Sequence, residues 1–236
     1  LGEEGTTIVG FSGLALLVSG CSGLYLWWPR SAGWRKAVWF KRGASGARFQ
    51  YDLHRCCGLY SVTVLLVVAF TGVCMSFPKQ ATSVVSRLSP VRNLPSPQTD
   101  HGPHHADPDA LLIAAQRVLP ASRLSVVWLP ENENESYRFT FLEPGHVGAY
   151  GGRSEVWVSP HDARVLAVRR FKDASSGEAF LRWQLPLHNG KAFGLVGRIL
   201  VCLAGLIPLV LFVTGLRIWY NKRRVKSLLS RTVSAS

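Results

Sequence analysis

The sequence predicts an α-helical membrane protein in which three transmembrane helices carry one α+β domain outside the membrane. Three stretches, at residues 7–28, 58–77 and 199–216, contain no Asp, Glu, Lys or Arg. Each is about 20 residues long, which at about 1.5 Å per residue matches the ~30 Å hydrocarbon core of a bilayer. A polar segment with helix and strand patterns separates the second stretch from the third.

These patterns divide the chain into seven segments. We expect transmembrane helices at residues 1–29, 52–77 and 187–221, a basic loop at 30–51, an irregular connection at 78–106, a folded outer domain at 107–186 and a basic tail at 222–236.

The formal net charge of +13 comes mainly from basic residues that flank the apolar stretches. By the positive-inside rule the loop and the tail face the cytoplasm, and residues 78–186 lie outside. The cations form no interleaved basic and aromatic patch, so anionic lipid headgroups are favoured as partners over nucleic acid. The residues concerned are Arg30, Arg35, Lys36, Lys41, Arg42, Arg48, Lys222, Arg223, Arg224, Lys226 and Arg231.

Two histidines lie at the ends of apolar stretches, His54 before the second and His188 before the third. An imidazole at a membrane boundary is costly to leave unpaired, and it is a good axial ligand for haem iron. An interfacial histidine bonded to a backbone carbonyl is the alternative for each one taken alone. A span of about 30 Å separates the two, so they predict two sites. Asp52 is a candidate partner for the second ring nitrogen of His54; the alternative is that its side chain simply faces the cytoplasm.

The first and third stretches align without a gap when 192 is added to the numbers of the first. Gly13 then matches Gly205, and Ser22 and Gly23 match Thr214 and Gly215. Small residues that recur on one face allow close packing of helices in lipid, and the match indicates a duplication. His188 projects to a position before residue 1, so we expect that an amino-terminal half-repeat is absent and that the fragment retains haem poorly.

The outer domain is expected to be one helix on a small antiparallel sheet. Asp107-Pro108-Asp109 is typical of a helix start, and the helix is expected at residues 110–119. Alternating apolar residues predict strands at 124–129, 137–142, 155–159 and 165–171, with a hairpin turn at 159–162. The preceding connection contains three histidines, His101, His104 and His105. Without cysteines or acids beside them, a solvated loop is favoured over a metal site.

The cysteines all fall in or beside the apolar stretches, and none lies in the outer domain. The neighbouring pair could be redox-active, but packing between helices is favoured. No Cys-x-x-Cys-His motif is present, which argues against covalently attached haem. The five residues are Cys21, Cys56, Cys57, Cys74 and Cys202.

The chain resembles the PepSY-associated transmembrane family over most of its length. The resemblance is carried by Asp52-Leu53-His54-Arg55 with Thr71-Gly72, by Leu187-His188-Asn189-Gly190 with Gly197-Arg198, and by Gly23-Leu24 with Thr214-Gly215-Leu216. The outer domain is similar to a PepSY domain at Val156-Trp157-Val158-Ser159-Pro160.

The resemblance implies a bacterial inner-membrane protein with four helices, which carries haem b at two sites and reduces periplasmic ferric siderophores. His54 would be an axial ligand on the cytoplasmic side and His188 one on the outer side, with partner histidines from the absent half-repeat. A basic surface of Arg182, Lys191 and Arg198 would attract an anionic ferric chelate, or else anchor the protein at the interface. The electron donor is not identified.

The resemblance also allows a different class of function. PepSY domains are associated with protease inhibition and with extracytoplasmic binding, so the chain could be a non-catalytic membrane-anchored module. A permease is disfavoured, because the apolar stretches lack acidic residues and broken helices.

Overall fold

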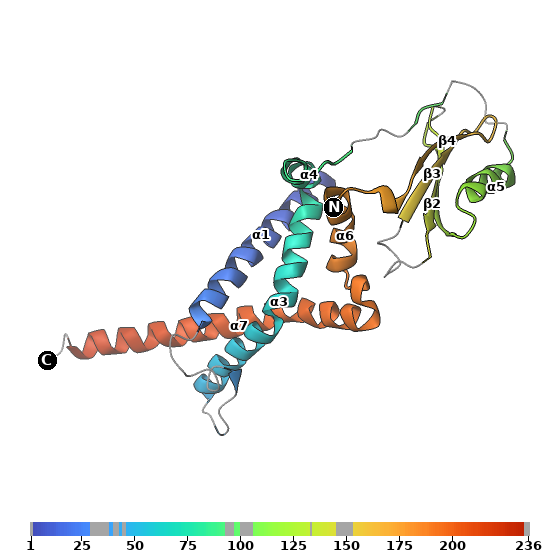
Figure 1. The fold of residues 1–236 in the computed structure, drawn as a ribbon. Helices are drawn as coiled ribbons and strands as arrows, with labels where there is room; N and C mark the ends of the chain where they lie inside the picture. Colours follow the sequence, from blue (N-terminus) through green and yellow to red (C-terminus); the bar gives the residue numbers. More distant parts are fainter. Residues whose placement is uncertain are drawn as a thin grey trace. The chain divides into compact units, whose positions relative to one another are not determined.

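The computed structural model of the chain describes residues 2–28, 38–39, 43, 46–92, 97–99, 106–132, 134–144 and 153–233, with side chains to residue 227. It contains two compact units. The helical unit comprises Leu1–Ser76 and Arg198–Ser236, and the α+β unit comprises Phe77–Gly197 (Figure 1). The predicted basic residues 30–42 and the histidines at 101–105 lie outside the described residues.

The helical unit is built from three long apolar helices, α1 (Gly2–Trp27), α3 (Gly46–Ser76) and α7 (Gly194–Val233). All three are long and apolar enough to cross a membrane, which confirms the predicted fold class. Large apolar side chains along α7 remain 55–68% exposed within the chain, as expected of a surface that faces lipid: Leu203, Leu206, Leu209 and Phe212.

Glycines on α1 allow it to pack closely on α3. A Cβ added at Gly13 would lie 3.1 Å from Cγ2 of Val73, and one added at Gly20 would lie 2.9 Å from Cδ2 of Leu66. Packing of this kind holds helices together in lipid, where the hydrophobic effect gives no preference for helix contact over lipid contact.

The α+β unit contains a four-stranded antiparallel sheet in the order β1-β2-β3-β4. The sheet consists of β1 (Arg123–Trp128), β2 (Tyr137–Leu142), β3 (Arg153–Val158) and β4 (Val165–Arg169). Helix α5 (Pro108–Val118) packs on one face of it (Figure 1), where Leu111, Phe139, Phe141, Val156 and Val158 form the core.

The local signals read from the sequence are confirmed in this unit. The side chain of Asp107 caps α5 by accepting a hydrogen bond from the backbone N–H of Asp109 at 3.1 Å, and Pro108 occupies the first turn. The hairpin between β3 and β4 is closed by a bond from the N–H of Ser159 to the carbonyl of Arg164.

Two helices of this unit were not expected from the sequence. The connection predicted to be irregular begins with α4 (Pro78–Ser86), in whose first turn Pro78 fits without a hydrogen-bond donor. Helix α6 (Ser176–His188) follows the 3-10 turn η1 (Phe171–Asp173), and the 3-10 turn η2 (Lys191–Phe193) links it to α7.

Candidate functional site

His54 lies in α3 and is half-buried against α7. Its Nδ1 atom is 2.9 Å from Oγ1 of Thr214, a residue of α7 that is only 5% exposed. Gly215 makes this approach possible, because a Cβ added there would lie 3.3 Å from Cε1 of the imidazole. Helix α7 therefore contacts the imidazole of His54 through the hydroxyl of Thr214 and the backbone at Gly215.

The hydroxyl of Thr214 determines which nitrogen of His54 carries the proton. Its Oγ1 lies 2.6 Å from the carbonyl oxygen of Val210, so the single hydroxyl hydrogen is donated within α7. A hydroxyl has one hydrogen and two lone pairs, and Oγ1 must then accept from the imidazole. This assigns the Nδ1–H tautomer to His54 and leaves the lone pair of Nε2 available for a ligand bond.

Asp52 does not hold His54, so the partner suggested by the sequence is wrong. Its carboxylate is 1% exposed, and its Oδ1 lies 3.3 Å from Nε of Arg48 and 3.1 Å from Nη2 of Arg55. Residues two apart on a helix point in different directions, whereas those three or four apart lie side by side. The acid therefore neutralises arginines of its own helix.

A hollow of about 510 Å³ begins within one turn of the His54–Thr214 contact on both helices. Its described lining comes from α3 and α7: Gln50, Leu216, Arg217, Trp219, Tyr220 and Asn221. The volume is within the range of about 300–1,000 Å³ that is usual for ligand and cofactor sites. Oε1 of Gln50 is buried and has no hydrogen-bond partner among the described residues.

In the internal alignment, Ser22 and Gly23 of α1 match Thr214 and Gly215 of α7. Within the described residues, no histidine is hydrogen-bonded to Ser22. Ser22 donates its hydroxyl to the carbonyl of Ser19 in its own helix. A Cβ added at Gly23 would meet nothing within 4 Å. Ser22 and Gly23 thus have the same residue types as Thr214 and Gly215, a hydroxyl residue followed by glycine. Among the described residues, no side chain or backbone packs against Gly23.

His188 is the last residue of α6 and lies in a sharp corner before α7. Gly190 turns the chain with φ 72°, and the N–H of Lys191 donates to Oδ1 of Asn189 at 3.0 Å. A Cβ added at Gly197 would lie 2.2 Å from the carbonyl oxygen of Gly190, so only glycine fits where α7 begins. The corner explains the glycines that follow His188 in the sequence.

A glutamine precedes each histidine by one helical turn. Gln184 is 4% exposed, and its Oε1, like that of Gln50, has no hydrogen-bond partner among the described residues. Sequence reasoning missed this shared Gln-x-x-x-His spacing. It places a buried polar atom without a described partner on the same helix face as each histidine.

A comparison with protein families finds a match over most of the chain. The model of the PepSY-associated TM region matches residues 1–222. The chain belongs to this family. No curated protein matches the chain.

The basic residues suggested as a substrate surface of this PepSY-associated protein have different environments. Arg182 is half-buried on α6 and donates to the carbonyl of Arg153 at 3.1 Å. Burial lowers the pKa of Arg182, with the charge of Glu155 opposing this effect. Lys191 is half-buried in η2, and Arg198 is exposed in the first turns of α7.

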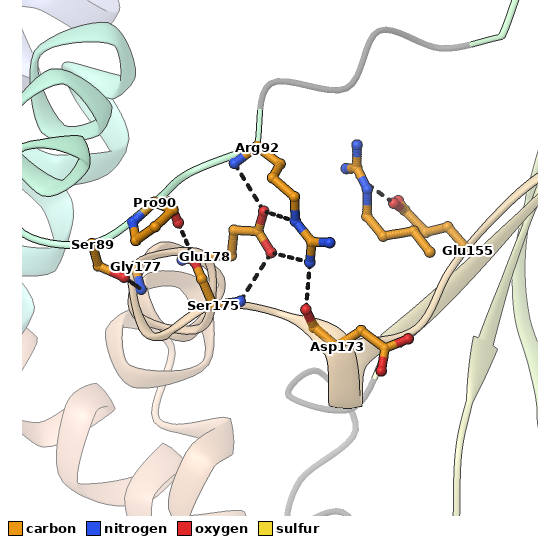
Figure 2. A network of polar contacts seen from close by, with 9 residues as sticks. Ser89, Pro90, Arg92, Glu155, Asp173, Ser175, Gly177 and Glu178 are labelled. Atoms are coloured by element: carbon orange, nitrogen blue, oxygen red, sulfur yellow. Dashed lines mark hydrogen bonds and ion pairs between the residues drawn. The ribbon is translucent and has the colours of Figure 1, made fainter.

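A network of hydrogen bonds, here called the clasp, joins Ser89 and Arg92 after α4 to Ser175, Gly177 and Glu178 at the start of α6 (Figure 2). Glu178 is 7% exposed; its Oε1 accepts from the backbone N–H of Arg92 at 2.9 Å and from Nε of Arg92 at 3.2 Å. Ser175 and Glu178 form a capping box, and Gly177 donates to the hydroxyl of Ser89 at 2.9 Å. Burial raises the pKa of Glu178, but the bonds from Arg92 and Ser175 outweigh it and leave the pKa below its usual value.

The PepSY-associated chain offers no metal site of the ordinary kind among its described residues. No group of three His, Cys, Asp or Glu side chains comes together there. The cysteines are free thiols, and Cys56, which is 1% exposed, donates to the carbonyl of Val38 at 3.6 Å.

Proposed function

We propose that this membrane protein binds haem b and transfers electrons to ferric chelates, with His54 and His188 as axial ligands at two separate sites. The hydrogen bond between His54 and Thr214 carries the proposal. A histidine that binds a metal through one nitrogen usually donates its other N–H to a fixed acceptor, which orients the ring and raises its basicity. Thr214 is such an acceptor.

The residues around His54 fit a macrocycle that carries carboxylates. Nε2 would hold the iron, and Gly215 leaves the ring of His54 against the backbone of α7. The guanidinium of Arg217, in the wall of the neighbouring hollow, would neutralise a carboxylate. The aromatic side chains of Trp219 and Tyr220 in the same wall would pack on the apolar face of the macrocycle.

His188 would serve the second site from the end of α6. Gln184, one turn earlier, supplies the same buried amide oxygen that Gln50 supplies before His54. The glycine corner after His188 fixes where the helix ends and so where the imidazole is held. The family resemblance implies that a further histidine completes each site.

The proposed reaction transfers one electron to each ferric ion. His54 and His188 would hold the haem, which when bound would supply one-electron redox chemistry, so that the ferric ion of the chelate would be reduced to ferrous by the electron that the haem gives up. No proton transfer is required, which agrees with membrane helices that lack acidic residues in their apolar stretches. Dithionite can supply the electrons in a test, so the cellular donor need not be known.

The test is an optical assay on the haem-loaded, intact gene product in detergent. After reduction by half a molecule of dithionite per haem, because dithionite supplies two electrons, anaerobic addition of ferric citrate should return the spectrum to the ferric form. His54→Ala should lose haem at one site, while the control His161→Ala, which changes a histidine of the β3–β4 hairpin, should behave as the wild type. A wild-type protein that binds no haem would refute the proposal.

A non-catalytic binding module is the second candidate, and one observation favours it. The α+β unit has its own core and its own clasp, so it has what a folded recognition domain needs. In that case the wild type would bind no haem and His54→Ala would leave its spectrum unchanged, so the optical assay separates the two candidates.

A further inference from the structure

Helix α4 packs on α6 with one side and exposes apolar side chains on another. Val85 lies on the α6 side, because a Cβ added at Gly177 would lie 2.9 Å from its Cγ1. The helical turn continues to Ser89, whose N–H donates to the carbonyl of Val85 at 2.9 Å and whose hydroxyl accepts from the N–H of Gly177 (Figure 2). Val84 and Leu88 are four residues apart, so they lie side by side, and they are 60% and 86% exposed.

The exposed side of α4 carries positive charge and no negative charge. Lys79 and Arg87 are exposed, and residues 78–92 contain no Asp or Glu. With 3.6 residues per turn, Arg87 lies about 60° around the helix from Val84, whereas Ser86 lies about 160° away. An apolar stripe with cations beside it is typical of a helix that lies in the interface of a membrane.

The connection to α3 keeps α4 close to the membrane. Helix α3, which is long and apolar enough to span a bilayer, ends at Ser76, and α4 begins at Pro78. The single residue between them can add at most about 3.6 Å to the path of the chain. The start of α4 therefore lies at the level where the α3 span ends.

The second connection of the α+β unit to the membrane has the same character. Helix α6 leads through η2 directly into α7, which is also a helix of membrane length. Phe193, the last residue of η2, is 70% exposed, and the exposed residues Leu195 and Arg198 follow it. Both ends of the unit thus present apolar side chains together with a cation, as chains do where they enter a bilayer.

A membrane surface fits the exposed side of α4 better than a protein partner does. The apolar stripe is only two side chains wide on a helix of 9 residues, far less than the roughly 800 Å² per partner of a stable protein interface. An interfacial helix needs only to place such side chains about 5–10 Å into the boundary between headgroups and acyl chains. Neighbouring Lys and Arg side chains then meet anionic headgroups.

We propose that α4 is an interfacial anchor. Val84 and Leu88 enter the boundary between headgroups and acyl chains, and Lys79 and Arg87 contact anionic phospholipid headgroups. Because the clasp joins the segment after α4 to the start of α6, the anchor also holds α6 against the membrane surface. The anchor requires neither haem nor electron transfer, so its test is independent of the haem proposal.

The experiment uses the whole chain in vesicles of phosphatidylcholine and phosphatidylglycerol. The fluorescent amino acid acridonylalanine replaces Leu88 or, separately, Ser86, the matched control that is exposed on the opposite side of the same helix. Lipids brominated in their acyl chains should quench the fluorophore at position 88 several-fold more strongly than at position 86. Iodide in the aqueous phase should quench the two positions in the reverse order.

Charge reversal tests the contact with anionic headgroups. In the chain labelled at position 88, Arg87→Glu should lower the quenching by brominated lipid in vesicles that contain phosphatidylglycerol, with a smaller effect in phosphatidylcholine alone. The control Arg117→Glu reverses the charge of an exposed residue of α5 and should leave the quenching unchanged. Quenching that Arg87→Glu also left unchanged would overturn the contact with anionic headgroups.

Two results would overturn the anchor itself. If brominated lipid quenched position 88 no more strongly than position 86, the stripe of Val84 and Leu88 would not face the membrane. If position 88 were shielded from both brominated lipid and iodide, protein would cover Leu88, and a second copy of the chain or another protein would be the occupant.

Discussion

Replacing Thr214 by Val removes the hydroxyl that holds Nδ1 of His54 and keeps the shape of the side chain. The wild-type distance between the two atoms is 2.9 Å, and Thr214 is 5% exposed, so water has little access to replace the lost acceptor. We expect weaker haem binding and a mixture of imidazole tautomers. Thr214→Ser retains the hydroxyl and should restore both properties.

The size of the effect follows from the hydrogen bond. Leaving a buried donor unsatisfied costs about 1–3 kcal/mol. The loss of an outer partner of a metal-binding histidine typically lowers metal affinity by about 10–100-fold, which is about 1.4–2.8 kcal/mol. The two scales agree, so Thr214→Val should weaken haem affinity by one to two orders of magnitude. The same free energy should keep roughly nine-tenths or more of wild-type His54 as the Nδ1–H tautomer without haem.

Two assays measure these quantities separately. Titration with haemin gives the affinity, and ¹⁵N NMR of histidine-labelled, haem-free protein gives the tautomer, with His54→Ala used to assign the signal. Ser61→Ala is the control, because Ser61 donates only to carbonyls of its own helix among the described residues. If Thr214→Val left both the haem affinity and the tautomer of His54 unchanged, the assignment of Thr214 as a positioning residue would be refuted.

Three further predictions concern the α+β unit and its connection to α7. Gly177→Ala should lower the free energy of unfolding by about 1–3 kcal/mol, because its Cβ would lie 2.9 Å from Cγ1 of Val85. Thermal unfolding measures this loss. The control Gly205→Ala should show no such loss, because its Cβ meets nothing within 4 Å. Glu178 has a lowered pKa when folded, so its contribution to stability is present above its unfolded pKa of about 4.3 and is lost as the pH falls through the folded value. Unfolding of Glu178→Gln between pH 7 and pH 3 should therefore depend less on pH than that of the wild type. Gly197→Ala places a Cβ 2.2 Å from a carbonyl oxygen and should make the corner between α6 and α7 sensitive to a protease that does not cut the wild type.

Much of the fold could be predicted because its signals are local. A charge-free stretch of membrane length identifies each long helix, and Asp107-Pro108 marks the start of α5. Helix α6 was missed although Ser175 and Glu178 have capping-box spacing, because the segment is short and contains Pro186. Attention to that spacing would have found it.

The site depended on contacts that a single sequence does not contain. His54 was found as a boundary histidine, but its partner lies 160 positions later, and nothing local pairs the two. Asp52 was a candidate because of its nearness in the chain, whereas helix geometry directs it to Arg48 and Arg55. The glutamines before the two histidines carried a readable signal in their equal spacing.

The most direct test of the central claim is a titration of the intact gene product in detergent with haemin, followed through the Soret band, for wild type, His54→Ala and His161→Ala. The account predicts saturable binding by the wild type and by His161→Ala, with one class of site lost in His54→Ala. Identical titration curves for all three proteins would contradict it.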